Sequence, residues 1–261
     1  MTHWATRSLA QIAAKRGIVP RIAHSTVSLI LRTAELQPHR SRYWKTPTLN
    51  EEFRERAARI LWCYERAFDL MARGELVICL DEKPAIQALE RCAPTQPMRS
   101  GQIERREFEY ERHGIENLLG ELVVCTGEMR GWCLEHNEGA HLRAILPKLL
   151  CRHRNARRIH VIWDGGSPHT AGETQDLLRD FYPWVRVLQT PPHASWLNQA
   201  ELLLRAFSAQ YLGRGDWASR GQLIDHINAS WPEYNRLFAH PFTWSWTRYR
   251  MHKWMDRHLN K

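Results

Sequence analysis

Two short apolar runs, each ending at an aspartate, place the strongest constraint on how this chain folds. Residues 76–80 lead into Asp81, and residues 159–163 lead into Asp164. A continuous apolar run of this length is typical of a buried strand. If the two strands are parallel neighbours, both aspartates lie at the carboxyl edge of the sheet. Open α/β sheets bind their ligands at that edge.

Strand and helix patterns alternate along the rest of this region. We expect strands at residues 75–82, 106–114, 118–135 (with a turn near Thr126), 157–164 and 184–192, and helices at 141–153, 170–182 and 195–213. This order predicts an α/β core with a mixed sheet over residues 75–215. We expect residues 216–261 to form a basic, tryptophan-rich helical extension.

A long helix is expected at residues 51–74, between Asn50, which can cap it, and Gly74, a helix-stop residue. Its apolar stripe consists of Phe53, Ile60, Leu61 and Phe68. We expect residues 48–74 to link the N-terminal segment to the core.

Residues 1–47 predict a helix-turn-helix segment that binds DNA, with a plain three-helix packing module as the alternative. A first helix at 6–17 stops at Gly17, and a second at 25–36 begins with Ser25 as its cap. Its expected buried stripe is Val27, Ile30 and Leu31. The candidate DNA contacts are Ser25, Thr26, Ser28 and Arg32 on this helix, and His39, Arg40, Arg42 and Lys45 in a basic arm suited to phosphates or a minor groove.

The formal net charge of +9 is concentrated at the two ends of the chain. Residues 1–48 carry eight Lys or Arg against one acid, and residues 236–261 carry six against one, so the middle is mildly acidic. Basic ends around an acidic centre suit a protein that binds a polyanion through its two ends and carries out metal-dependent chemistry in the region between them. Solubility charge is the alternative, but it predicts interspersed signs.

Composition argues against several other classes of protein. Hydrophobic residues make up 43% and charged residues 25%, as in ordinary globular domains. No apolar run approaches the roughly 20 residues that a membrane span needs, and the N-terminus lacks the apolar core of a signal peptide. The six cysteines form no Cys-x-x-Cys pair, so we expect reduced core thiols in a cytosolic protein.

A third acid, Glu201, is expected to point inward from the helix at 195–213. It lies four residues after Leu197 and three before Leu204, so it shares their face. An inward carboxylate is costly unless it binds a cation. The ordinary alternatives are an ion pair with Arg205 for Glu201, and a turn cap or a solvated loop acid for the two aspartates.

Taken in order, three motifs that contain these acids resemble the catalytic signatures of DDE transposases of the mariner superfamily, particularly its bacterial insertion-sequence branch. The motifs are "LDEK" at 80–83, "WDGGSPH" at 163–169 and "SWLNQAE" at 195–201. The step of 37 residues from Asp164 to Glu201 is similar to that superfamily's spacing. Residues 25–47 also resemble the end of its DNA-binding region, and residues 212–244 resemble its C-terminal tail.

The resemblance implies a ribonuclease-H-like (retroviral-integrase-like) core that cuts DNA at element ends and joins the freed 3′-hydroxyl to target DNA. It implies that Asp81, Asp164 and Glu201 are catalytic and hold two Mg²⁺ ions, for which Mn²⁺ can substitute; such oxygen ligands suit these ions. The implied partners are double-stranded DNA, as terminal inverted repeats and target, and a second copy of the chain in a homodimer on DNA. The implied location is the cytoplasm, in association with the nucleoid.

His169, Ser195 and Asn198 are accessory candidates within these motifs. For His169, a contact to DNA or water is weighed against an ordinary polar residue at a helix start. Members of the superfamily commonly carry a further helical DNA-binding unit ahead of the one seen here, so we expect a chain truncated at its N-terminus. Two other functions stay open: an inactive DNA-binding remnant, and a general ribonuclease-H-like nuclease without strand transfer.

Overall fold

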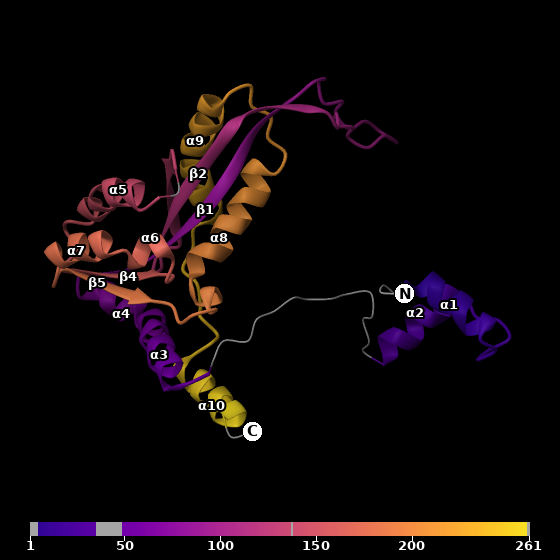
Figure 1. The fold of residues 1–261 in the computed structure, drawn as a ribbon, viewed down its shortest axis with the longest axis horizontal. Helices are drawn as coiled ribbons and strands as arrows, with labels where there is room; N and C mark the ends of the chain where they lie inside the picture. The colour runs from indigo at the N-terminus through magenta and orange to yellow at the C-terminus, as the bar shows by residue number, and fades with distance from the viewer. Residues whose placement is uncertain (1–4, 35–48, 137, 260–261) are drawn as a thin grey trace. The chain divides into compact units, whose positions relative to one another are not determined.

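The computed structural model describes residues 5–34, 49–136 and 138–259, whose fold is shown as a ribbon in Figure 1. The chain divides into two units, residues 1–46 and residues 47–261. Nearly all of the buried apolar side chains in the described residues belong to the second unit.

The first unit contains two short helices, α1 (Thr6–Lys15) and α2 (His24–Thr33). As expected, α1 ends before Gly17, which has a left-handed φ of 69° that glycine adopts without strain. The expected cap of α2 is wrong. The N-cap residue is Ala23, and Ser25 lies inside the first turn.

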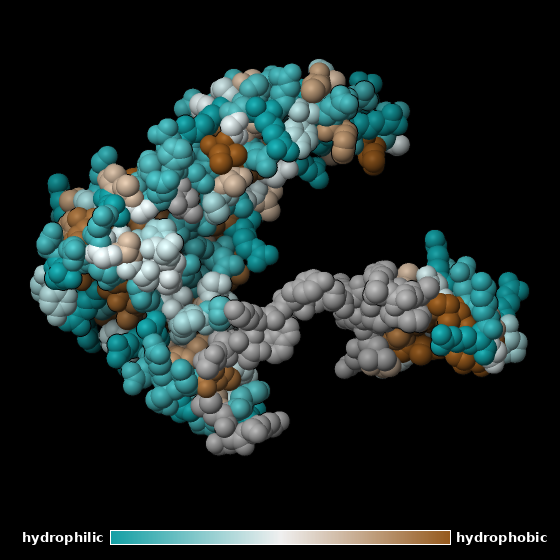
Figure 2. Space-filling view, viewed as in Figure 1, coloured by the Kyte–Doolittle hydropathy of each residue, from teal (hydrophilic) through white to brown (hydrophobic). Residues whose placement is uncertain are grey.

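Apolar side chains of this unit are only partly covered. Val27 is buried as expected, but Ile30, predicted for the same stripe, is 53% exposed. The space-filling view shows apolar surface over α1 and α2 (Figure 2). The described part of the unit offers α2 one other helix to pack against, which cannot cover a full stripe.

The second unit is built on a five-stranded sheet with the order β3-β2-β1-β4-β5. The strands are β1 (Glu75–Arg91), β2 (Tyr110–Val123), β3 (Glu128–Leu134), β4 (Arg158–Trp163) and β5 (Val185–Gln189). β1, β2 and β3 pair antiparallel, whereas β1, β4 and β5 run parallel. The prediction of an α/β core with a mixed sheet is confirmed.

β1 continues well past the aspartate at which we expected it to end. It runs to Arg91 and pairs with β2 as a long hairpin, with a register shift between Lys83 and Ile86. Ala85, within the shift, has a left-handed φ of 57°, and its N–H donates to the Asn117 side-chain oxygen at 3.0 Å. This local irregularity lets the strand continue beyond Asp81.

The expected helix at 51–74 is two helices, α3 (Glu51–Glu65) and α4 (Ala67–Ala72), which meet at Arg66. Asn50 caps α3 as expected, since its Oδ1 accepts a hydrogen bond from the Phe53 N–H at 2.8 Å. The break rotates Phe68 out of the predicted stripe, and it is 53% exposed.

The remaining helices are α5 (Gly139–Arg152), α6 (Ser167–Thr170), α7 (Gly172–Asp180), α8 (Gln199–Phe207), α9 (Arg220–Phe238) and α10 (Arg248–Leu259). A short 3-10 turn, Ser195–Leu197, precedes α8, and a π-helical turn, Ser208–Leu212, follows it. Figure 1 shows α5 and α7 to one side of the sheet and α8 to the other.

Two further expectations concern the chain as a whole. All six cysteines are free, but Cys92 and Cys151 are exposed, so the prediction of core thiols is wrong for these two. In the described part of the chain, no helix combines the length and apolar character that crossing a membrane requires.

Candidate active site

The register of β1 and β4 brings two of the predicted acids to one edge of the sheet. The two strands are parallel, and their last paired residues are Cys79 and Ile162. Asp81 and Asp164 each lie two residues beyond this pair, so they occupy equivalent positions at the carboxyl edge. This is the juxtaposition that the two apolar runs predicted.

α8 carries the third predicted acid and packs against this edge through a glycine. Gly120 of β2 pairs directly with Asp81. A side chain at position 120 would therefore lie on the same face of the sheet as the Asp81 side chain. A Cβ at Gly120 would lie 2.6 Å from the Leu204 side chain of α8. The missing side chain therefore lets α8 approach the sheet closely and brings Glu201 toward Asp81.

Two buried hydrogen-bonding groups fix the start of α8. The Asn198 Oδ1 accepts from the Ala200 N–H at 3.2 Å, and its Nδ2 donates to the Leu80 carbonyl at 2.7 Å. The Tyr64 hydroxyl, from α3, donates to the Leu197 carbonyl at 2.6 Å. Asn198 thus caps α8 and also ties it to the residue before Asp81, which is a positioning role.

The other predicted acids act electrostatically on Asp81. Burial raises the pKa of Asp81 to about 7, and the charges of Glu82, Asp164 and Glu201 add to the rise. A hydrogen bond from the Glu82 N–H to the Asp81 Oδ1, at 3.0 Å, acts in the opposite direction. Among the described residues, no ion pair joins Glu201 to Arg205, so the ordinary alternative for Glu201 has no support in this structure.

His169 is the cation that faces these acids. Its Nδ1 lies 2.7 Å from the Asp164 Oδ1, and its Nε2 lies 2.6 Å from the Glu82 Oε1. Its ring stacks on Trp163 with centroids 4.4 Å apart. Burial opposes protonation, but the two carboxylate partners outweigh it and raise the pKa of His169 to about 9. The same hydrogen bond lowers the pKa of Asp164.

Glu82 is a residue that the sequence reasoning did not select. In the described structure, ligand atoms of Glu82, Asp164 and His169 lie within 4.8 Å of one another, whereas Asp81 and Glu201 fall outside this group. Glu82 stands inside the "LDEK" motif, directly after Asp81, and alternation along a regular strand would direct it away from its neighbour. The signal that identifies it is its bond to His169, which sequence does not show.

The two glycines after Asp164 keep the edge of the sheet accessible. A Cβ at Gly165 would meet nothing within 4 Å. A Cβ at Gly166 would lie 3.0 Å from the Asp164 Oδ1, and the Gly166 N–H donates to that same oxygen at 2.9 Å. A side chain at position 166 would crowd the carboxylate, so Gly166 preserves room for a ligand at Asp164.

The other predicted contact residues are only partly described. Ser25, Thr26 and Arg32 are exposed on α2, and Ser28 is half-buried on the same helix. His39, Arg40, Arg42 and Lys45 lie outside the described residues. Ser195 is exposed at the start of the 3-10 turn, where its carbonyl accepts from the Asn198 N–H at 2.7 Å.

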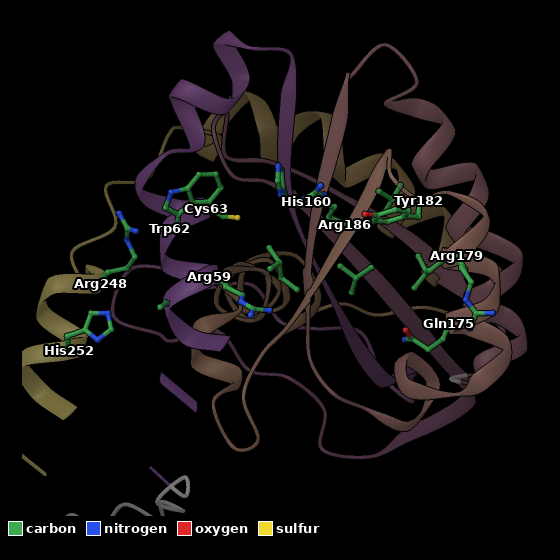
Figure 3. Close-up of a pocket in the computed structure, with 15 residues that line it drawn as sticks. Arg59, Trp62, Cys63, His160, Gln175, Arg179, Tyr182, Arg186, Arg248 and His252 are labelled. Carbon is green, nitrogen blue, oxygen red and sulfur yellow. The ribbon is translucent and has the colours of Figure 1, made fainter. Parts of the chain in front are cut away.

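A concavity of about 930 Å³ lies elsewhere, beside the edge strand β5. Figure 3 shows Trp62 of α3, His160 of β4 and Arg186 of β5 among its lining side chains, with Arg179 of α7 across the opening. None of the predicted acids lines it. Asp81 and Asp164 lie instead at the carboxyl edge of the parallel strands.

A mixed sheet with carboxylates gathered at the carboxyl edge of its parallel strands is the arrangement expected of a ribonuclease-H-like enzyme. A sequence profile of the DDE superfamily endonucleases matches residues 76–224, more than half of the chain and a range that contains all three predicted acids. The chain therefore belongs to the DDE superfamily endonucleases. No curated protein matches the chain by sequence.

Solved structures of the Mos1 mariner transposase share this fold. A Mos1 paired-end complex with Mn is 16% identical and has a TM-score of 0.57, over 97% of this chain and 72% of that one. A pre-cleavage Mos1 transpososome is 16% identical and has a TM-score of 0.56, over 98% of this chain and 73% of that one. A Mos1 strand transfer complex is 17% identical and has a TM-score of 0.53, over 97% of this chain and 71% of that one. At this level of identity the likeness concerns the fold, and it confirms the expected ribonuclease-H-like core.

Proposed function

We propose that the chain is a transposase of the mariner type, which cuts DNA at the ends of a mobile element and transfers the freed 3′ end into target DNA. The observation that carries the proposal is the parallel register that places Asp81 and Asp164 at one edge, with the charge of Glu201 acting on Asp81. The titles of the Mos1 structures describe paired-end and strand transfer complexes of that protein, and this chain has the same fold. The bacterial insertion-sequence branch remains our expectation within this class.

Asp81, Asp164 and Glu201 would hold two divalent cations, Mg²⁺ or Mn²⁺. The donor set fits such ions, because it consists of carboxylate oxygens and the charges of Asp164 and Glu201 help to raise the pKa of Asp81. In the described residues, the one ion pair made by any of the three acids is that of Asp164 with His169. Paired divalent cations supply charge neutralisation and nucleophile activation for in-line displacement at a phosphate. Glu82 is a further oxygen donor within reach of Asp164.

The protein's own groups would orient these ligands. His169, held by the Trp163 ring, fixes the Asp164 carboxylate through a 2.7 Å hydrogen bond. Asn198 holds the start of α8 and so sets the position of Glu201. Because Gly165 offers no side chain, a DNA phosphate can approach the edge from solvent.

The proposed partners are double-stranded DNA, as element ends and target, and a second copy of the chain that pairs the two ends. The basic N-terminal segment is proposed to recognise the element ends, since Lys and Arg contacts to phosphate release counterions. The protein would then act on chromosomal DNA, in the cytoplasm and in association with the nucleoid.

The test is metal-dependent processing of DNA that carries the inverted repeats flanking the gene. Incubation with Mg²⁺ or Mn²⁺ is expected to yield 3′-hydroxyl ends and then joined products, and Asp164→Asn is the matched inactive control. Cleavage without joining would replace the proposal with a general nuclease. A chain that binds these ends but cuts them with neither metal would be a DNA-binding remnant.

A further inference from the structure

A second concave surface lies on the same unit, at the end of the sheet opposite the predicted acids. It measures about 690 Å³ and is lined by the end of β2, the start of β3, Lys148 of α5 and residues 151–155, which precede β4. Asp164 follows the other end of that strand. A strand of six residues spans roughly 20 Å, so the two sites are separated by about that length.

Four cations border this surface without an acidic partner. They are Arg130 of β3, Lys148 and Arg152 of α5, and Arg154 just beyond it, and all four are exposed. None of them forms an ion pair with any described residue, and Glu128 is the acid among the lining side chains. We name these four residues the distal basic patch.

The local sequence explains why the patch is uncompensated. Residues 139–163 contain no Asp or Glu but six Lys or Arg. Three of the six are neutralised, because Arg143 pairs with Glu173 while Arg157 and Arg158 pair with Glu75. The other three belong to the patch. The patch thus lies within the middle of the chain, although that region as a whole is mildly acidic.

Neighbouring contacts hold the patch in place. The Arg152 guanidinium lies 5.7 Å from the centroid of the Trp132 ring, a cation–π contact that keeps it on the surface. His153, between Arg152 and Arg154, is tied to the fully buried Glu121 by a 2.5 Å contact from its Nε2. This contact anchors the segment that carries both arginines.

The shape of the patch favours a polyanion over a single small anion. Small phosphate sites use backbone N–H groups at a helix N-terminus, whereas the helix end here is the C-terminus of α5, whose free carbonyls repel an anion. What remains is a set of long side chains spread around an open hollow. Such side chains suit the repeated phosphates of duplex DNA.

We propose that the distal basic patch binds the phosphate backbone of duplex DNA outside the catalytic edge. The proposal rests on the proposed function in taking DNA as the polyanion. It adds a contact that neither the DDE motifs nor the basic ends of the chain supply. The patch would hold DNA that extends beyond the cleaved phosphate.

The test compares two double variants of the full chain with equal net charge. Arg152→Gln/Arg154→Gln removes two patch cations, whereas Arg66→Gln/Arg179→Gln removes two exposed cations that are already paired with Asp69 and Asp176. Binding of a long random-sequence duplex is measured across a salt series. The patch variant should lose roughly 10- to 30-fold in affinity and about two units of the log–log salt slope, since each lost phosphate contact removes about 0.9.

The control variant should bind like the wild type, and melting curves should match for all three proteins. Equal losses in the two variants, or no loss in either, would overturn the proposal. The measurement requires no cleavage, so it stands apart from the test of transposition. If the chain cuts DNA, the patch variant should keep its rate at saturating DNA.

A thiol in the lining allows the contact to be mapped. Cys151 is exposed and lines the hollow. A photo-crosslinker attached to Cys151 in a Cys92→Ser background should join to bound duplex, and adding Cys151→Ser should abolish that product. A Cys151-labelled protein that binds DNA but never crosslinks to it would count against the patch.

Discussion

The two ends of the β1–β4 pair treat a buried carboxylate in opposite ways. At the amino end, Glu75 of β1 contacts Arg157, Arg158 and His160. Burial would raise its pKa, but the His160 hydrogen bond and the arginine charges outweigh burial and lower the pKa. At the carboxyl end, burial raises the pKa of Asp81 to about 7, and the charges of the neighbouring acids add to the rise.

The difference separates an acid that stabilises the fold from one whose charge works against it. Glu75 is surrounded by three cations from the start of β4 and the residue before it, so its charge is balanced without any ligand. Asp81 would gain from a bound cation the charge balance that Glu75 already has from the protein. Burial alone therefore does not distinguish these two carboxylates, whereas the charge of their neighbours does.

The largest expected effect is on catalysis at the carboxyl end. Asp164→Asn should reduce metal-dependent cleavage about 10³-fold or more, because a metal ligand worth several kcal/mol in the transition state is lost. Binding of DNA should survive, so the loss is measured at saturating DNA. A variant that cuts at the wild-type rate would remove Asp164 from the active site.

At the amino end, Glu75→Gln should lower the free energy of unfolding by about 2–3 kcal/mol near neutral pH, since Arg157 and Arg158 remain charged and lose their acid. The depressed pKa means that this stabilisation is present above the ordinary value of 4.5 and is lost as pH falls through the lower folded value. Melts of both proteins should therefore converge in acid. Cleavage by the folded variant should be unchanged, and a large loss would mean that both ends serve catalysis.

The reverse pH dependence is expected of Asp81 in metal-free protein. Because the folded state binds its proton more tightly than the unfolded chain does, stability falls as pH rises from 3.8 to about 7. Asp81→Asn should remove that penalty and raise the free energy of unfolding by about 2 kcal/mol at pH 8, but not at pH 4. Mg²⁺ should stabilise the wild type more than the variant. A variant less stable than wild type at pH 8 would contradict the comparison.

The smallest effect is expected at Asn198, which belongs neither to the charged residues around Glu75 nor to those around Asp81. Asn198→Ala should cost about 1–2 kcal/mol, because α8 loses its cap and the buried Leu80 carbonyl loses a donor. Asn198→Asp retains the capping oxygen but cannot donate, so it separates the two contributions. Both should lower the cleavage rate moderately, and equal stability of wild type and Asn198→Ala would exclude the positioning role.

The sequence predicted the sheet and two of its acids well because the relevant signal is local. Apolar runs ending at Asp81 and Asp164 need only a parallel register to converge, and the register is as expected. Interactions between distant segments were not visible in the same way. The bond from His169 to Glu82, 87 residues away, depends on how α6 packs against β1. The cations around Glu75 likewise come from a different strand.

The predictions that were wrong also failed where distant segments interact. β1 was expected to end at Asp81 because the continuous apolar run ends there, but pairing with β2 carries the strand on to Arg91. Phe68 was assigned to a buried stripe by helical periodicity, which failed where the helix breaks at Arg66. Periodicity describes an unbroken element and cannot report where tertiary packing interrupts it.

Two paired glycines, Gly120 of β2 and Gly131 of β3, offer positions at which mutations can lower activity partially and do not abolish it. A Cβ at Gly120 would meet Leu204 of α8, and one at Gly131 would meet Trp231 of α9. Replacing a catalytic carboxylate silences the enzyme in a single mutation. Adding a methyl group at either glycine instead displaces a whole helix slightly. A library selected for weakened but surviving activity should therefore accumulate alanine and serine at these two positions and leave the acids untouched.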